Sequence, residues 1–169
     1  MDMIAIDIGN STVNLSVFVK EQMSPAEHIG AAEQDRLGEM LVRFRGACGP
    51  QPLGAKTVPV VVSSVNRKSL AVVEAAVLKG LDQNVLLVGR EVPLGMKLAI
   101  ENPETVGTDR LLTAYAAYEV VQAAVVVADF GTATTINCVN DQGIFLGGVI
   151  MPGLHLAARS LKDYTDALP

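Results

Sequence analysis

The sequence lacks any hydrophobic run long enough to cross a membrane. Its longest uninterrupted apolar stretch runs from Ala123 to Ala128, well short of the roughly 18 residues that a spanning helix needs. The N-terminus also lacks the basic stretch of a signal peptide. We therefore expect a cytoplasmic protein with no membrane partner.

Charge, cysteine and histidine are scarce too. Charged residues make up 18% of the chain, against roughly 25% in an average soluble domain. The net charge of −5 is spread along the chain, which argues against a nucleic-acid-binding surface. Cys48 and Cys138 have no CxxC spacing and are expected to be free thiols. His28 and His155 have no partner at metal-ligand spacing, so we expect surface or packing residues.

Hydrophobic residues are abundant and make up half of the 169 residues. Their spacing follows a period of two in some segments and a helical period in others. Period-two or fully apolar segments predict strands over 3–8, 13–19, 58–65, 84–88, 125–130, 134–140 and 144–151. Helical spacing and stop signals predict helices over 33–45, from a cap at Asn66 or Ser69 to about Gly80, over 109–122 and over 154–163. Residues 89–106 show no clear period and are expected to form a long loop. The order of elements predicts an α/β fold.

One motif occurs twice. IAIDIGNSTVNLSV near the start and VVADFGTATTINCV later share an apolar strand, an aspartate near its end, a glycine two residues on and a polar cluster before a second strand. Asp7 and Gly9 thus match Asp129 and Gly131 at an offset of 122 residues. A tight turn of this kind leaves backbone N–H groups and hydroxyls at its tip beside a carboxylate, which suits a phosphate chain and its metal ion.

A single Asp-x-Gly at a hairpin is usually turn chemistry only. Two matching copies are more specific, and they indicate a duplicated domain whose halves face each other across a nucleotide cleft.

Four motifs together carry a resemblance to a known family. In chain order they are DIGNS at 7–11, GTDR at 107–110, DFGTATT at 129–135 and GGVIMPG at 147–153. Their order and spacing resemble type III pantothenate kinases, which belong to the superfamily of acetate and sugar kinases, heat-shock protein 70 and actin. The resemblance implies an actin-like (ribonuclease H-like) duplicated α/β fold, with a complete first half over 1–124 and the start of a second half over 125–169. Because family members are longer, the chain is expected to correspond to their N-terminal two thirds.

The resemblance also implies an activity: ATP-dependent phosphorylation of pantothenate to 4′-phosphopantothenate, the first step of coenzyme A synthesis. It implies a homodimer that uses ATP, Mg²⁺ and a monovalent cation, K⁺ or NH₄⁺. The implied ATP- and phosphate-binding residues are Asp7, Gly9, Asn10, Ser11, Asp129, Gly131 and Thr132, with Asp7 and Asp129 as the metal-binding carboxylates. The implied substrate-binding residues are Gly107, Thr108, Asp109 and Arg110, with Asp109 as the general base. The implied adenosine-binding residues are Gly147, Gly148, Pro152 and Gly153.

Each of these roles has a plainer alternative. Asn10 and Ser11 could form a self-bonding turn, and the threonines of the second motif could simply be β-branched strand residues. Asp109 could be an N-cap with Arg110 as a solvated surface charge. GGVIMPG could be a strand end followed by a helix start.

Two positions depart from the family pattern. Ile100 stands where a tyrosine is expected in the substrate site, and Asn137 stands where many members carry aspartate, so substrate affinity or cation binding is expected to differ. The alternative functions are a non-catalytic regulator resembling Bvg accessory factor and another small-molecule kinase of the superfamily, acting on a sugar or on acetate.

Overall fold

The structure is a computed structural model that describes residues 2–30, 35–49 and 57–166. It divides into two compact units, Met1–Pro93 and Leu94–Pro169, and each is treated by itself. Helix α3, which precedes the second copy of the repeated motif, belongs to the second compact unit. The predicted boundary between duplicated halves at 124/125 is a different division, drawn from the repeat, and it stays a prediction.

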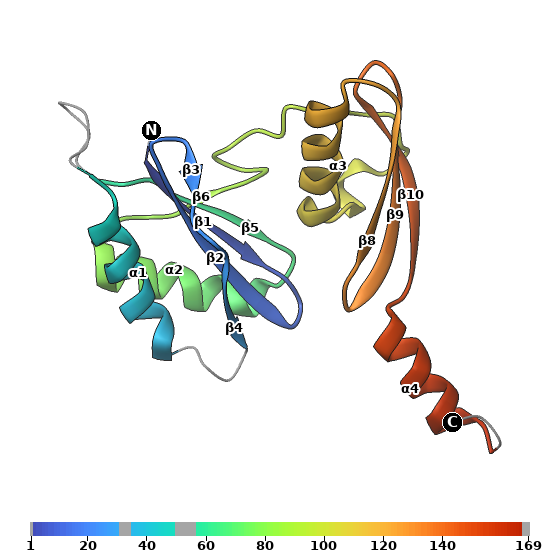
Figure 1. The fold of residues 1–169 in the computed structure, drawn as a ribbon, viewed down its shortest axis with the longest axis horizontal. Coiled ribbons are helices and arrows are strands. Elements are labelled where there is room, and N and C mark those ends of the chain that lie inside the picture. Colours follow the sequence, from blue (N-terminus) through green and yellow to red (C-terminus); the bar gives the residue numbers. More distant parts are fainter. Residues whose placement is uncertain (1, 31–34, 50–56, 167–169) are drawn as a thin grey trace. The chain divides into compact units, whose positions relative to one another are not determined.

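The first unit is a mixed sheet with two helices packed against it. Its sheet has the order β3-β2-β1-β5-β6, and β4 pairs with β2. β1 is antiparallel to β2 and parallel to β5, and Figure 1 shows α1 and α2 together on one side of the sheet. The elements are β1 (Met3–Ile8), β2 (Thr12–Val19), β3 (Gln22–Met23), β4 (Glu27–Gly30), α1 (Asp35–Ala47), β5 (Val60–Ser64), α2 (Arg67–Leu81) and β6 (Leu86–Leu87).

Alternation along β1 builds the core of this unit. Ile4, Ile6 and Ile8 are buried, and they cluster with apolar residues of the two helices, such as Leu41 and Val77. Side chains at every second position of a strand point to one face, so the three isoleucines share the face that the helices cover.

The ends of α2 follow from two polar residues. The Asn66 side chain accepts hydrogen bonds from the backbone N–H groups of Lys68 and Ser69, at 3.1 and 3.2 Å, which satisfies donors that have no partner in the first turn. Asp82, in the left-handed conformation at φ 51°, ends the helix. Asn66 was one of the two predicted caps, and the helix ends at Leu81, next to Gly80, where its end was predicted.

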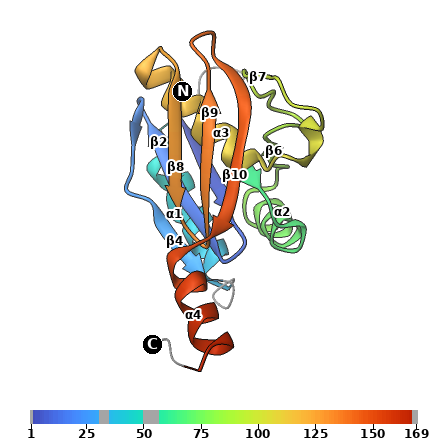
Figure 2. The same cartoon turned by 90° about the vertical axis from the view of Figure 1, so that its right-hand side faces the viewer.

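The second unit is a four-stranded sheet of order β7-β10-β9-β8, with α3 on one face and α4 following the last strand (Figure 2). Two of its elements, β7 and η1, lie in the segment that was predicted to be only a loop. The elements are β7 (Lys97–Leu98), the 3-10 helix η1 (Pro103–Thr105), α3 (Thr108–Val121), β8 (Val125–Phe130), β9 (Ala133–Val139), β10 (Ile144–Pro152) and α4 (Leu154–Tyr164).

The strands predicted over 134–140 and 144–151 form a hairpin of β9 and β10, and its turn has a clear chemical cause. The side chain of Asn140 accepts hydrogen bonds from the N–H groups of Gln142 and Ile144, at 3.0 and 2.9 Å. Gly143 takes a φ of 72°, a conformation that favours glycine. Phe145, which follows, is fully buried and packs with Leu111 of α3.

Candidate active site

The first copy of the repeated motif forms the turn between β1 and β2. Asp7 lies one residue before the end of β1 and pairs with Asn14 on β2. The N–H of Gly9 donates to the carbonyl of Thr12 at 3.0 Å, which closes a tight turn. Asp7 is exposed at the base of this turn, as the motif predicts.

The fold itself does not require a glycine at position 9. Its φ lies outside the left-handed region, and a Cβ there would come no closer than 3.5 Å to another residue, an ordinary contact. Nor does the turn satisfy itself through Asn10, whose exposed side chain has no hydrogen-bond partner among the described residues. Ser11 does have an interaction within the chain, so the choice between a phosphate-binding tip and plain turn chemistry stays a prediction.

Asn14 binds the Asp7 carboxylate, and His28 in turn binds Asn14; neither was predicted as a site residue. Asn14 Nδ2 donates to Asp7 Oδ2 at 3.3 Å, and Asn14 Oδ1 lies 2.7 Å from His28 Nδ1. Because the amide donates to Asp7 through its nitrogen, its oxygen must accept, so Nδ1 of His28 carries the proton. His28 is indeed a surface residue, but it fixes the orientation of Asn14. No motif contains this pair, and only the strand register brings it together.

The second copy of the motif has the same form. Asp129 on β8 pairs with Thr135 on β9, and the N–H of Gly131 donates to the carbonyl of Ala133 at 3.0 Å. A Cβ on Gly131 would come no closer than 3.7 Å to its nearest neighbour, so this glycine is not required by packing either.

Gly153, by contrast, is required by packing. Its N–H donates to the carbonyl of Thr132 at 3.1 Å, and a Cβ on it would lie 2.2 Å from the carbonyl oxygen of Gly131. The start of α4 is thereby held against the turn between β8 and β9. The alternative interpretation of GGVIMPG as a strand end and helix start is thus correct for Gly153, and the same contact places that helix start at the loop.

Gly147 and Gly148 also have structural reasons. Gly147 has a φ of 102° at a β-bulge of β10, and a Cβ on Gly148 would lie 1.9 Å from the carbonyl oxygen of Ile136. Both glycines line the same pocket as Arg110. Their predicted contact with adenosine stays a prediction.

The GTDR motif starts α3, but not as the simple alternative assumes. The N-cap is Gly107, and Asp109 lies in the first turn, where its Oδ1 accepts a hydrogen bond from the N–H of Arg110 at 2.8 Å. Asp109 is exposed, and its other carboxylate oxygen has no partner among the described residues. The N-cap interpretation of Asp109 is therefore wrong.

Arg110 is not a solvated surface charge either. It is half-buried, its Nε donates to Asn137 Oδ1 at 2.8 Å, and its guanidinium carbon lies 6.0 Å from the centre of the Phe145 ring. That distance is at the outer limit for a cation–π contact. Arg110 is thus anchored to β9 and β10 rather than extended into solvent.

An open pocket of about 700 Å³ adjoins Arg110 within the second unit. Ile100 contributes an apolar wall where the family resemblance expects a tyrosine. A volume in this range is typical of small-molecule sites. The remaining lining includes Phe145, Gly147, Gly148 and residues of the segment 98–106.

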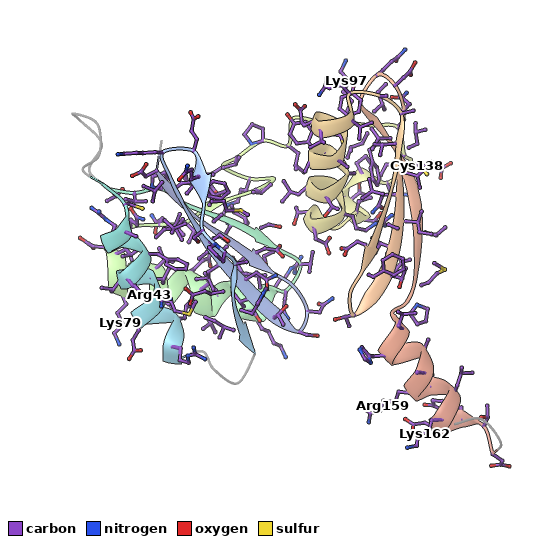
Figure 3. The ribbon with its side chains drawn as sticks, viewed as in Figure 1. Arg43, Lys79, Lys97, Cys138, Arg159 and Lys162 are labelled. Atoms are coloured by element: carbon purple, nitrogen blue, oxygen red, sulfur yellow. The ribbon has the colours of Figure 1, made fainter. Side chains whose placement is uncertain are left out.

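The described residues offer no preformed multidentate metal site. No group of three or more His, Cys, Asp or Glu side chains comes together among residues 2–30, 35–49 and 57–166. Cys48 and Cys138 are free thiols, as predicted. Burial raises the pKa of the Cys48 thiol. Cys138 lies on the face of β9 away from α3 (Figure 3). No helix in the described part of the chain is long and apolar enough to span a membrane.

Solved structures with similar folds confirm the predicted fold class. A Ppx/GppA phosphatase from Aquifex aeolicus matches with a TM-score of 0.55 at 11% identity, over 98% of this chain and 56% of that chain. An activator of 2-hydroxyisocaproyl-CoA dehydratase from Clostridium difficile, solved with bound ADPNP, matches with a TM-score of 0.51 at 14% identity, over 98% and 53%. Such low identities show the fold alone, which is that of the actin-like superfamily.

Sequence relatives are more specific. A protein from Moorella thermoacetica named type III pantothenate kinase is 32% identical over 168 residues, and one of the same name from Anaeromyxobacter sp. strain K is 34% identical over 170 residues. Each alignment covers 99% of this chain and 66% of the relative, so the chain spans slightly less than two thirds of their length. A family model described as type III pantothenate kinase matches residues 3–169. The chain therefore belongs to the type III pantothenate kinase family.

Proposed function

We propose that this chain provides the substrate-binding and phosphate-binding elements of an ATP-dependent pantothenate kinase. The observation that carries the proposal is the start of α3, where the exposed Asp109 directly precedes Arg110, a guanidinium anchored beside an open pocket. Pantothenate has both groups that such a pair would serve, a hydroxyl to deprotonate and a carboxylate to bind.

Asp109 would act as the general base. Its free carboxylate oxygen takes the proton from the pantothenate hydroxyl, whose oxygen attacks the γ-phosphorus of ATP. The bond between that phosphorus and the β–γ bridging oxygen breaks, and ADP leaves with the bonding electrons. Arg110 would bind the pantothenate carboxylate, because a guanidinium forms charge-assisted hydrogen bonds to such a group.

The two phosphate loops would bind the ATP phosphates through backbone N–H groups and hydroxyls. Glycines at positions 9 and 131 fit this role, because packing within the described residues does not require a glycine at either position. Asp7 in the first unit and Asp129 in the second are each proposed as a carboxylate that would bind Mg²⁺, since hard oxygen ligands suit this ion. Bound Mg²⁺ would neutralise phosphate charge. The same proposal includes a homodimer, a monovalent cation (K⁺ or NH₄⁺), the adenosine contacts and a cytoplasmic location.

A coupled assay of ATP consumption with pantothenate, simple sugars and acetate, alongside calorimetric binding of ATP and pantothenate, tests the function. Turnover with pantothenate alone supports it, and turnover with a sugar or acetate supports the other kinases. Binding without turnover on any substrate favours the regulator.

Asp109→Asn tests the base directly. We expect turnover to fall by about 10²–10⁴-fold with ATP affinity little changed, because the phosphate loops stay intact. Asp141→Asn, an exposed hairpin residue of the same unit, is the matched control and should retain full activity. Turnover of Asp109→Asn within threefold of the unsubstituted chain would reject Asp109 as the base.

A further inference from the structure

Asn137 is a fully buried polar residue in the middle of β9, with 0% of its surface exposed. Both ends of its side chain are used: Oδ1 accepts from Nε of Arg110 at 2.8 Å, and Nδ2 donates to Oγ1 of Thr135 at 3.2 Å. A buried amide whose two ends have different partners has one orientation, because a flip would place the NH₂ group against the guanidinium.

The Arg110 guanidinium forms no ion pair in the described part of the chain, and one acidic residue, Glu101, lines the same pocket without pairing with it. Its hydrogen-bonding partner is the neutral amide of Asn137, and none of the described acidic side chains forms an ion pair with it. Its terminal Nη groups have no hydrogen-bond partner among the described residues, while the side chain lines the open pocket. A half-buried cation with free donors is matched best by an anionic ligand.

We propose that Asn137 is a positioning residue that sets the charge of this pocket. It anchors Arg110 through Nε with a neutral group, so that the guanidinium keeps its full positive charge and offers its Nη groups to a ligand. The consequence is selectivity: the pocket prefers a carboxylate-bearing substrate over the same molecule with a neutral group in that place. The identity of the substrate as pantothenate rests on the proposed function. The effect of Asn137 on the binding of anions by Arg110 does not depend on it.

Asn137→Asp is the sharpest variant. The aspartate has the same shape and keeps an acceptor for Nε of Arg110, and the Thr135 hydroxyl can rotate to donate to the second oxygen. The variant therefore retains the geometry but places a negative charge beside the guanidinium, so that the pair has no net charge. Asn140→Asp is the matched control, because its side chain only accepts hydrogen bonds in the hairpin turn and the substitution adds the same charge outside the pocket.

Calorimetry with pantothenate and with its neutral alcohol analogue, pantothenol, measures the preference. We expect the unsubstituted chain to prefer pantothenate, and Asn137→Asp to reduce this preference about tenfold, which corresponds to about 1.4 kcal/mol. Asn140→Asp should leave the preference within twofold. Sulfate binding can be measured by titrating sodium sulfate and following the side-chain Nε–H signal of Arg110 by nuclear magnetic resonance. We expect sulfate to bind about tenfold more weakly to Asn137→Asp than to the unsubstituted chain.

The sulfate measurement separates the two proposals. If the unsubstituted chain does not bind pantothenate but sulfate binding responds to Asn137→Asp as expected, the proposed substrate is wrong and the role of Asn137 holds. If Asn137→Asp leaves both the preference and the sulfate affinity within twofold, the role of Asn137 is wrong.

A measurement on the unsubstituted chain covers the case in which Asn137→Asp does not fold. The Nε–H of Arg110 should exchange with solvent at least tenfold more slowly than that of Arg159, which is 80% exposed on α4. Equal exchange rates would overturn the proposal.

Discussion

Gly153→Ala should destabilise the second unit and the phosphate loop together. Gly153 is buried at the start of α4, and the added methyl group would lie 2.2 Å from the carbonyl oxygen of Gly131 and 2.6 Å from that of Thr132. Both neighbours are backbone atoms, which cannot rotate away as a side chain can. The loop or the helix must therefore shift by about 1 Å to restore a normal contact.

The size of the effect follows from two contributions. Overpacking costs about 1–3 kcal/mol, and the shift weakens the hydrogen bond from Gly153 to Thr132, at 3.1 Å, which contributes about 0.5–1.5 kcal/mol. We expect a loss of about 2–4 kcal/mol in the free energy of unfolding. In a domain of this size each kcal/mol lowers Tm by about 4–8 °C, so Tm of the second unit should fall by at least about 8 °C.

Circular dichroism during heating measures Tm, and hydrogen exchange of β9 and β10 assigns the loss to the second unit. Gly80→Ala is the matched control, because a Cβ there meets nothing within 4 Å and should stabilise α2 by about 0.5–1 kcal/mol. ATP should bind more weakly to Gly153→Ala and normally to Gly80→Ala. A Tm of Gly153→Ala within 2 °C of the unsubstituted chain would show that the contact between helix start and loop is not as described.

Three further predictions test other parts of the chain. Gly9→Ala should fold normally, because its Cβ has room, yet bind ATP at least tenfold more weakly in calorimetry; unchanged ATP affinity would show that the turn is not a phosphate loop. Phe145→Ala should cost the second unit about 3–5 kcal/mol in denaturant unfolding, and a loss below 1 kcal/mol would contradict its place in the core. Hydrogen bonds from the N–H groups of Lys20 and Gly49 lower the pKa of Asp2 from 3.8. The stability that these hydrogen bonds contribute is therefore complete above about pH 4 and is lost as the pH falls through the lowered pKa of Asp2. Asp2→Asn should remove this pH dependence of the unfolding midpoint at acid pH.

Sequence patterns predicted those features that depend on neighbours along the chain. The bounds of β1 and β8 agree with the predicted ranges, because both strands are apolar segments bounded by turn residues. The cap at Asn66 follows from local chemistry as well. The short strand β7 was missed because its two residues carry no periodic signal, and it exists only by pairing with β10.

The site shows the same limit. Its motifs could be read from the sequence because each is a short local turn or helix start. The pair of Arg110 and Asn137 could not, because it forms only when α3 packs on β9, and the contact of Asn14 with His28 depends on the register between β2 and β4. Such contacts decide how Arg110 and Asp7 are oriented, and they depend on the fold rather than on any local motif.

The repeated motif also shows that a pattern specifies which face of a strand is apolar, but not what covers it. Val126 and Phe130 on β8 stand at the positions that Ile4 and Ile8 occupy on β1. The isoleucines are fully buried under α1 and α2, whereas Val126 and Phe130 are 67% and 69% exposed in the described residues. The same alternation therefore gives a buried face on β1, where α1 and α2 pack, and an exposed face on β8, whose other face carries Val125 against the core that contains α3.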